Sequence, residues 1–268
     1  MKYKITVIGG GNLGTSIAKG LIKSGLFKNE DILVTEKREQ RIKYLEKKGF
    51  NVITDNVIAA KEARIILICV KPQQMMPVLK EIKSQVKGEK IILYTVTGIL
   101  MSNIEKELGK LPIFRIMPNT GIEVCESMTC ISSANAKEDI EKEIISIFDK
   151  LGKTVIIDED LMPAATVLGA CGIAYALRFM RAATQGGIEI GFGSEMSQLI
   201  AAQTIKGATQ LILENGEHPE KEIDKVTTPQ GITISGLNEM EHQGFSSALI
   251  KGLITSYNKL TNNKPNKN

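Results

Sequence analysis

Short apolar runs alternate with amphipathic segments over the first 160 residues of the chain. The segments between the runs, such as residues 12–24 and 38–48, have apolar positions at helical spacing. The runs themselves are rich in β-branched residues and have the length of buried strands; they cover residues 5–8, 32–34, 52–53, 65–70, 91–96, 114–116, 128–131 and 155–157. Strands separated by helices of this length predict a doubly wound parallel sheet with both faces covered.

The pattern changes after about residue 160. β-Branched alternation almost disappears, and apolar positions follow helical spacing over residues 161–189, 194–214, 231–243 and 246–260. We therefore predict two domains, an α/β domain over residues 1–160 and an all-helical domain over residues 161–268.

The most apolar part of the helical half covers residues 164–177. It is interrupted by Gly169 and Gly172 and closed by Arg178. Since a membrane span needs ~20 apolar residues, the stretch predicts a buried core helix and no membrane partner. This stretch and residues 182–187 are glycine- and alanine-rich and too apolar to face water, which predicts a partner helix and at least a homodimer.

Composition narrows the class of protein. Of the 268 residues, 43% are hydrophobic and 24% are charged, which is typical of a globular chain with a sizeable core. The net charge of +4 is spread along the sequence and aromatic residues make up only 4%, which argues against a nucleic-acid partner. Four cysteines and two histidines are scattered without ligand spacing, so we expect neither a disulfide framework nor a metal site. The first apolar run is too short for a signal-peptide core, and we expect a cytoplasmic protein.

A glycine-rich turn follows the first predicted strand. After Ile8, glycines stand at positions 9, 11 and 14 in the pattern Gly-x-Gly-x-x-Gly, and a predicted helix begins at Asn12. Gly9 would permit the tight turn, Gly11 the approach of a pyrophosphate, and Gly14 the close packing of helix and strand. The N-terminus of that helix offers unpaired N–H groups to the phosphates. The arrangement predicts a dinucleotide site.

The end of the second strand carries signals for two cofactors. Glu36 stands where a carboxylate would hold the ribose hydroxyls of NAD. Lys37 and Arg38 follow at once, and a basic pair could hold the 2′-phosphate of NADP or simply begin the next helix in solvent. We favour NADPH and leave NADH open.

Two later strands end in candidate binding residues. Cys69-Val70-Lys71-Pro72 closes one strand, and Asn119 lies in the segment Met-Pro-Asn-Thr that follows another. Ligands of open α/β sheets bind beyond the carboxyl ends of the strands. Lys71 could therefore reach an anionic group, although a lysine in a surface turn would have the same sequence.

A second candidate site lies in the helical half, at Thr228-Pro229-Gln230-Gly231-Ile232-Thr233. A loop of this composition leading into a helix leaves several N–H groups free, with hydroxyls beside them. Such a pocket would suit a carboxylate. Taken alone, the segment also fits an ordinary capped helix start.

These segments together resemble the pyrroline-5-carboxylate reductase family. The resemblance covers nearly the whole chain in order and includes residues 8–14, 70–72, 98, 117–120, 201–203, 216–219, 228–237 and 244–245. It implies an N-terminal Rossmann domain, a C-terminal helical domain that dimerises with its partner, NADPH or sometimes NADH as cofactor, and reduction of 1-pyrroline-5-carboxylate to L-proline.

The resemblance also implies site residues. With the candidates above, the predicted cofactor-binding set is Ile8, Gly9, Gly11, Asn12, Leu13, Gly14, Thr35, Lys37, Arg38, Asn56, Cys69, Val70, Lys71, Pro72 and Asn119. The substrate carboxylate is expected against Thr228, Gly231, Ile232 and Thr233, and the Thr233 hydroxyl, the predicted catalytic group, is expected to point at the ring nitrogen of the cyclic imine.

The chain departs from the family pattern in the helical half. Residues 169–173 lack the family's two serines and its proline, Ile223 lies in Glu-Ile-Asp where the family has Leu-Lys-Asp, and Gln230 replaces a glycine. Two alternatives stay open, a reductase of another cyclic imine and a non-catalytic NAD(P)-binding paralogue. A β-hydroxyacid dehydrogenase is disfavoured because residues 164–181 contain no lysine. The two threonine hydroxyls disfavour the non-catalytic alternative, because a dead site would have no need of them.

Overall fold

The computed structural model describes residues 1–262. It divides into two compact units, one containing Met1–Cys171 with residues 259–262, the other Gly172–Asn258. The domain limit predicted near residue 160 falls just after the last strand and stays a prediction. Residues 263–268, which end the predicted second domain, lie outside the described residues.

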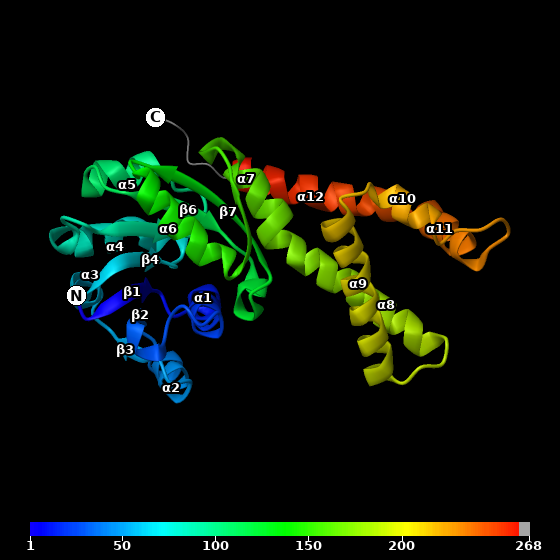
Figure 1. Ribbon diagram of the computed structural model, residues 1–268, viewed down its shortest axis with the longest axis horizontal. Coiled ribbons are helices and arrows are strands. Elements are labelled where there is room, and N and C mark those ends of the chain that lie inside the picture. Colours follow the sequence, from blue (N-terminus) through cyan, green and yellow to red (C-terminus); the bar gives the residue numbers. More distant parts are fainter. Residues whose placement is uncertain (263–268) are drawn as a thin grey trace. The chain divides into compact units, whose positions relative to one another are not determined.

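The first unit is built on one eight-stranded sheet in the order β3-β2-β1-β4-β5-β6-β7-β8 (Figure 1). Each apolar run predicted as a strand is one. In chain order the strands are β1 (Tyr3–Ile8), β2 (Ile32–Thr35), β3 (Asn51–Ile53), β4 (Ala63–Ile68), β5 (Ile91–Tyr94), β6 (Ile113–Met117), β7 (Ser127–Ala134) and β8 (Gly152–Ile156). The order reverses direction between β1 and β4, the crossing at which doubly wound sheets bind their ligands.

The predicted parallel sheet is confirmed, with one antiparallel pair that the sequence did not predict. β6 and β7 run antiparallel, with Ile113 opposite Ala134 and Met117 opposite Cys130. A parallel neighbour needs a crossover of a dozen or more residues. Only a short 3-10 helix, Thr120–Val124, lies between these two strands, so the chain turns back on itself.

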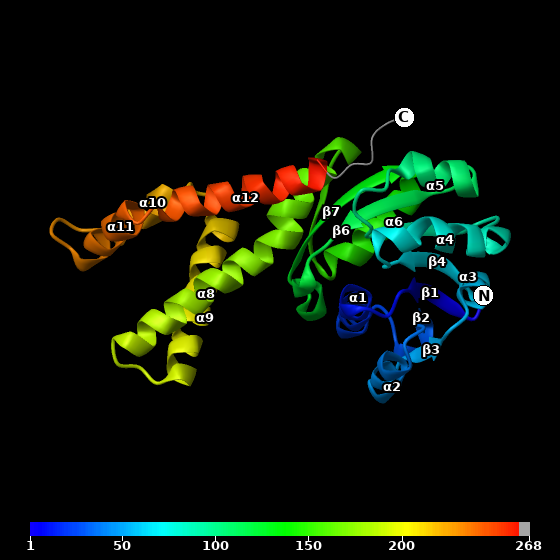
Figure 2. The ribbon, with the colours of Figure 1, turned by 180° about the vertical axis from the view of Figure 1, so that it is seen from behind.

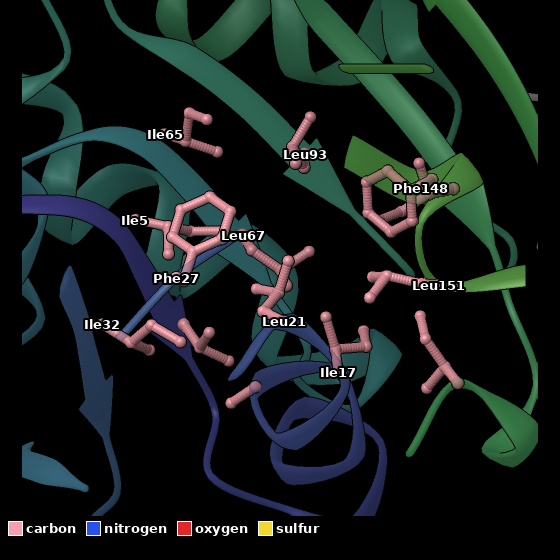
Figure 3. Close-up of a cluster of buried hydrophobic side chains, with 14 of the residues drawn as sticks. Ile5, Ile17, Leu21, Phe27, Ile32, Ile65, Leu67, Leu93, Phe148 and Leu151 are labelled. Atoms are coloured by element: carbon pink, nitrogen blue, oxygen red, sulfur yellow. The ribbon is translucent and has the colours of Figure 1, made fainter. Parts of the chain in front are cut away.

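Helices cover both faces of the sheet, as the sequence predicts. Alternate residues of each central strand enter different cores: Ile65 and Leu67 of β4 join one cluster, while Ile66 and Ile68 join the other. The first cluster, part of which is drawn in Figure 3, packs on α1 (Asn12–Lys23), α2 (Glu39–Lys47) and α6 (Glu138–Asp149). The second packs on α3 (Asn56–Glu62), α4 (Pro72–Ile82) and α5 (Met101–Leu108).

The single helix predicted over residues 161–189 is interrupted. A short helix, α7 (Met162–Ala165), passes into a π-helical segment, Thr166–Cys171, before α8 (Gly172–Glu189) begins. The π segment holds Gly169, a residue with poor helix propensity, and coincides with the departure from the family pattern at residues 169–173. The hydrophobic periodicity alone does not reveal the wider turn.

All the regular secondary structure of the second unit is helical (Figure 2). After α8 follow α9 (Ser194–Asn215), α10 (Pro219–Asp224), α11 (Ile232–His242) and α12 (Phe245–Asn262); α10 is additional to the predicted helices. α8 and α9 approach closely at Gly187, where an added Cβ would lie 2.1 Å from the Ser197 Oγ. α8 contacts α12 through the edge-on rings of Phe179 and Phe245, 6.0 Å apart.

The prediction that residues 164–177 form a helix buried in the chain's own core is wrong. The helical stretch Glu159–Glu189 is long and apolar enough to cross a membrane by length and composition, and only 11% of its most apolar window is buried within the chain. Leu177, Phe179 and Ile188 are exposed along α8. An apolar face of this size requires a covering partner.

Candidate functional site

The glycine turn sits between β1 and α1 at the crossing of the sheet. The N–H groups of Gly9 and Gly10 donate to the Thr35 carbonyl, at 3.2 and 2.8 Å. Gly9 has φ +108°, and an added Cβ would lie 2.5 Å from the Cys69 carbonyl oxygen; at Gly14 it would lie 2.2 Å from the Gly9 carbonyl oxygen. A side chain would not fit at either position.

Gly11 differs from its neighbours. A Cβ built on it meets no atom within 4 Å, so the space in front of this residue is open. Gly11 begins α1 with no side-chain hydrogen bond to cap it. The first-turn N–H groups at Asn12 and Leu13 are thus available to an anion, beside the positive end of the helix dipole. This geometry fits a dinucleotide pyrophosphate.

Glu36 and Arg38 form a tight ion pair just beyond β2. Arg38 donates from Nε to Oε1 at 3.1 Å and from Nη2 to Oε2 at 2.8 Å. The Lys37 and Arg38 N–H groups also donate to Oε1, at 2.9 and 3.0 Å. Burial raises the pKa of Glu36, but these hydrogen bonds outweigh it and hold the pKa below its ordinary value. The carboxylate is already neutralised, while the Arg38 side chain remains 68% exposed.

Thr35 and Asn56 are buried beside this pair. The Thr35 hydroxyl donates to the Asn56 Oδ1 at 2.7 Å, and the Asn56 Nδ2 donates to the Glu81 Oε2 at 2.9 Å. Since the Thr35 carbonyl also holds the glycine turn, this residue links the turn to α3.

Arg41 is a residue of this site that the sequence reasoning missed. From the first turn of α2 it donates to the carbonyls of Gly10 and Gly11 and to the Thr15 hydroxyl, at 2.8, 3.2 and 2.9 Å. The sequence could have indicated Arg41 by its spacing from Arg38. Residues three apart share a helix face, so a basic residue three positions after Arg38 lies on the same side of the helix.

The end of β4 continues this edge. Cys69 donates its backbone N–H to the Ile8 carbonyl at 2.8 Å, and burial raises the pKa of its thiol to about 12, so the thiol stays protonated and unreactive. Val70 is half-buried, and Lys71 is exposed immediately before Pro72, the first residue of α4.

Asn119 follows β6 and faces the π segment. Its Nδ2 donates to the Gly169 carbonyl at 3.2 Å, and its Oδ1 accepts from the Gly121 N–H at 2.9 Å. The amide is therefore committed to protein partners. The structure brings the other predicted cofactor residues to one edge of the sheet, whereas the side chain of Asn119 holds a loop.

The Thr228–Thr233 segment belongs to the second unit. The Gly231 N–H donates to the Thr228 carbonyl at 2.9 Å, which closes a turn with Pro229 and Gln230 at its centre. Gln230 has φ +59°. A Cβ on Gly231 would lie 2.6 Å from the Thr228 Oγ1, so this position requires glycine.

The turn leads directly into α11. Gly231 caps the helix without a side-chain hydrogen bond, and Ile232 and Thr233 form its first turn. Ile232 is 92% exposed, and the side chains of Thr228 and Thr233 are exposed as well. Free N–H groups beside two exposed hydroxyls are chemically suited to an anion.

Over residues 1–262, no cluster of three His, Cys, Asp or Glu side chains is placed to hold a metal ion.

Two family models match the chain. Residues 159–262 match the model described as pyrroline-5-carboxylate reductase dimerisation, and residues 4–97 match NADP oxidoreductase coenzyme F420-dependent. The matches correspond to the helical half and to the half that carries the glycine turn.

Curated relatives align with almost all of the chain. The chain is 46% identical to pyrroline-5-carboxylate reductase 1 of Dictyostelium discoideum, over 95% of this chain and 49% of the relative. It is 42% identical to pyrroline-5-carboxylate reductase 2 of the same organism, over 95% and 91%. A Methanosarcina acetivorans pyrroline-5-carboxylate reductase is 33% identical over 94% of both chains. The chain thus spans about half the length of the first relative and nearly all of the other two.

Solved structures share the fold. The Plasmodium falciparum pyrroline carboxylate reductase with NADP bound has a TM-score of 0.87 at 25% identity and covers 99% of this chain and 100% of its own. A pyrroline-5-carboxylate reductase from Coxiella burnetii has a TM-score of 0.84 at 27% identity, with the same coverage.

Proposed function

Since this chain belongs to the pyrroline-5-carboxylate reductase family, we propose that it reduces 1-pyrroline-5-carboxylate to L-proline with a nicotinamide dinucleotide. The observation that carries the proposal is the open space in front of Gly11, between two glycines that tolerate no side chain. The turn is shaped for a pyrophosphate, and the same chain provides a free helix start flanked by hydroxyls for a carboxylate.

We propose NADPH as the preferred cofactor. Lys37 and Arg38 place two positive charges at this end of the site, against the single carboxylate of Glu36. The surplus favours a phosphate on the adenosine ribose. Contacts with the cofactor would come from Ile8 to Gly14, Thr35, Lys37, Arg38, Asn56 and the segment from Cys69 to Pro72, with Asn119 supporting the site through its loop.

The substrate carboxylate would bind at the start of α11. The N–H groups at Ile232 and Thr233 and the Thr228 hydroxyl are the available donors, since the Gly231 N–H is already bound to the Thr228 carbonyl. A carboxylate at this end of the helix is favoured by the helix dipole as well as by hydrogen bonds. The Thr233 hydroxyl, one residue inside the helix, would then be directed at the ring nitrogen.

The reaction needs no strong protein acid. When bound, the dinucleotide supplies a hydride to the carbon of the C=N bond. The imine nitrogen is basic enough to take its proton from solvent, and Thr233 would orient the protonated nitrogen by accepting a hydrogen bond. The protein thus contributes binding and orientation, which lower the barrier by fixing the reacting groups in place.

A second copy of the chain would cover the exposed apolar face of α8. The dimerisation model matches residues 159–262, which include this helix. We propose that the protein forms a homo-oligomer through the helical half, with a homodimer as its smallest unit. We also propose a cytoplasmic location, supported by four cysteines that form no disulfide.

The departures at residues 169–173 and at Gln230 favour one alternative, reduction of a different cyclic imine. The test is oxidation of NADPH and of NADH, followed at the nicotinamide absorbance, with 1-pyrroline-5-carboxylate and the purified chain. We expect oxidation with L-proline as product, faster with NADPH. Cofactor binding without oxidation would favour the other imine or a non-catalytic protein.

A further inference from the structure

Arg41 connects the adenosine end of the cofactor site to the glycine turn. Its Nε lies 2.8 Å from the Gly10 carbonyl oxygen, and its Nη2 lies 3.2 Å from that of Gly11. The same Nη2 is 2.9 Å from the Thr15 Oγ1. The guanidinium carbon lies 4.6 Å from the ring centroid of Tyr44, a cation–π contact that holds the side chain from the other side.

These contacts fix the backbone of the turn in one orientation. Thr15 donates its hydroxyl to the Gly10 carbonyl at 3.1 Å, which closes a small network with Arg41. The N–H groups of Gly9 and Gly10 point the opposite way, to the Thr35 carbonyl. The N–H groups of Gly9 and Gly10 and the carbonyls of Gly10 and Gly11 are therefore all hydrogen-bonded within the protein, and the space in front of Gly11 stays open.

The positive charge of Arg41 has a second consequence. Carbonyl oxygens carry partial negative charge and would repel a pyrophosphate that approaches Gly11. A guanidinium bound to two of those oxygens offsets the repulsion, and its attraction for phosphate is strengthened where the site is shielded from water. Arg38, by contrast, is bound to Glu36 beyond the end of β2 and has no hydrogen bond to the turn among the described residues.

We propose that Arg41 is a positioning residue for the pyrophosphate turn, which strengthens the binding of NADPH and NADH by the same factor. Selection of the 2′-phosphate then rests with Lys37 and Arg38. This division of roles rests on the proposed function, because it requires a nicotinamide dinucleotide in the site.

The test is the dissociation constant of each cofactor, measured by fluorescence titration of the full chain without substrate. Arg41→Met should raise the dissociation constants of NADPH and of NADH about tenfold each, the effect expected when a charge-assisted hydrogen bond is lost. Arg41→Lys keeps the charge but not the planar guanidinium. It should raise the two dissociation constants by the same factor, and by less than Arg41→Met does. Arg38→Gln should weaken NADPH alone. Lys43→Gln, which removes an exposed charge from the same helix, is the matched control and should leave both constants unchanged.

The unfolding temperature of each variant without cofactor provides the second readout. Arg41→Met with a lower unfolding temperature but unchanged dissociation constants would reduce Arg41 to a structural residue and overturn the proposal. A loss confined to NADPH would also overturn it, since Arg41 would then contact the 2′-phosphate. If Arg41→Met fails to fold, Arg41→Lys decides the question. Equal losses of NADPH and NADH affinity in that variant support the proposal, whereas unchanged affinities or a loss confined to NADPH overturn it. A wild-type chain that binds neither cofactor would contradict the proposed function itself.

Discussion

Arg115 and Glu159 form an ion pair in which the arginine side chain is only 4% exposed. Arg115 lies on β6, and its Nη1 is 3.2 Å from the Glu159 Oε1. The same oxygen accepts hydrogen bonds from the Tyr94 hydroxyl at 3.2 Å and from the Met101 N–H at 2.9 Å. One carboxylate oxygen thus connects β5, β6 and the start of α5 to the segment after β8 that contains Glu159.

Removal of the Glu159 charge should destabilise the fold. Glu159→Gln would leave the Arg115 guanidinium buried without a counter-ion, and its Nε already has no hydrogen-bond partner within residues 1–262. We expect a loss of about 3 kcal/mol in the free energy of unfolding, measured by urea denaturation at fixed protein concentration. Glu138→Gln is the control, because Glu138 and its partner Lys142 are largely exposed. If both variants lost the same free energy of unfolding, burial of the Arg115–Glu159 pair would not be the cause of the destabilisation.

Substitutions at two glycines of the turn should have different effects, one on stability and the other on cofactor binding. Gly14→Ala places a Cβ 2.2 Å from the Gly9 carbonyl oxygen, so the backbone must move and the free energy of unfolding should fall by about 1–3 kcal/mol. Gly11→Ala adds its methyl group to open space at φ −67° and should leave that free energy unchanged. The same methyl group would occupy the pyrophosphate position and weaken NADPH by at least about tenfold in a fluorescence titration. Normal NADPH affinity in Gly11→Ala would contradict the assignment of the turn.

The sequence predicted those features that depend on local pattern. The apolar run at residues 65–68 identified a strand buried on both faces, and the glycine spacing identified the turn that Gly9 and Gly14 build. It did not predict the reversal between β6 and β7, because an apolar run carries no sign of strand direction. Arg41 was missed for a related reason, since its partners are backbone carbonyls 30 and 31 residues away in the chain.

The ion pair at Glu36 should make stability depend on pH. The pKa of the folded-state carboxyl is held below its ordinary value of 4.5, so Glu36 contributes stability above that value, and the contribution is lost as the pH falls through the folded-state pKa. The difference in unfolding free energy between the wild type and Glu36→Gln should therefore be constant well above pH 4.5 and shrink as the pH falls below that value. A difference that stays constant as the pH falls below that value would contradict the pairing.

Thr233 should affect turnover and not cofactor affinity. Thr233→Ala removes the hydroxyl from the exposed first turn of α11 while leaving its N–H groups in place. We expect kcat with 1-pyrroline-5-carboxylate to fall about 100-fold, the scale of a misoriented reacting group, with the NADPH dissociation constant unchanged. Thr233→Ser restores a hydroxyl and should recover most of the activity. Unchanged turnover in the alanine variant would remove Thr233 from the mechanism.

Gln230 occupies a backbone conformation that favours glycine. Its φ of +59° comes at the third position of the turn after Pro229, where a left-handed residue is required and a side chain is unfavourable by about 1 kcal/mol. Gln230→Gly should raise the free energy of unfolding by that amount. Asn135→Gly, at φ +57° in the first unit, is the matched control and should give a smaller gain, because asparagine tolerates this conformation better.

The substrate constants then show whether the strained glutamine also serves binding. Its exposed amide follows Thr228 and Pro229, next to the proposed carboxylate position at the start of α11. If the amide donates to the carboxylate, Gln230→Gly should raise KM for 1-pyrroline-5-carboxylate about five- to tenfold with kcat unchanged, and should leave KM for 1-pyrroline, which has no carboxylate, as it was. Asn135→Gly should change neither constant. A gain in stability with both KM values unchanged would mean that the side chain is tolerated at this turn and does not take part in recognition.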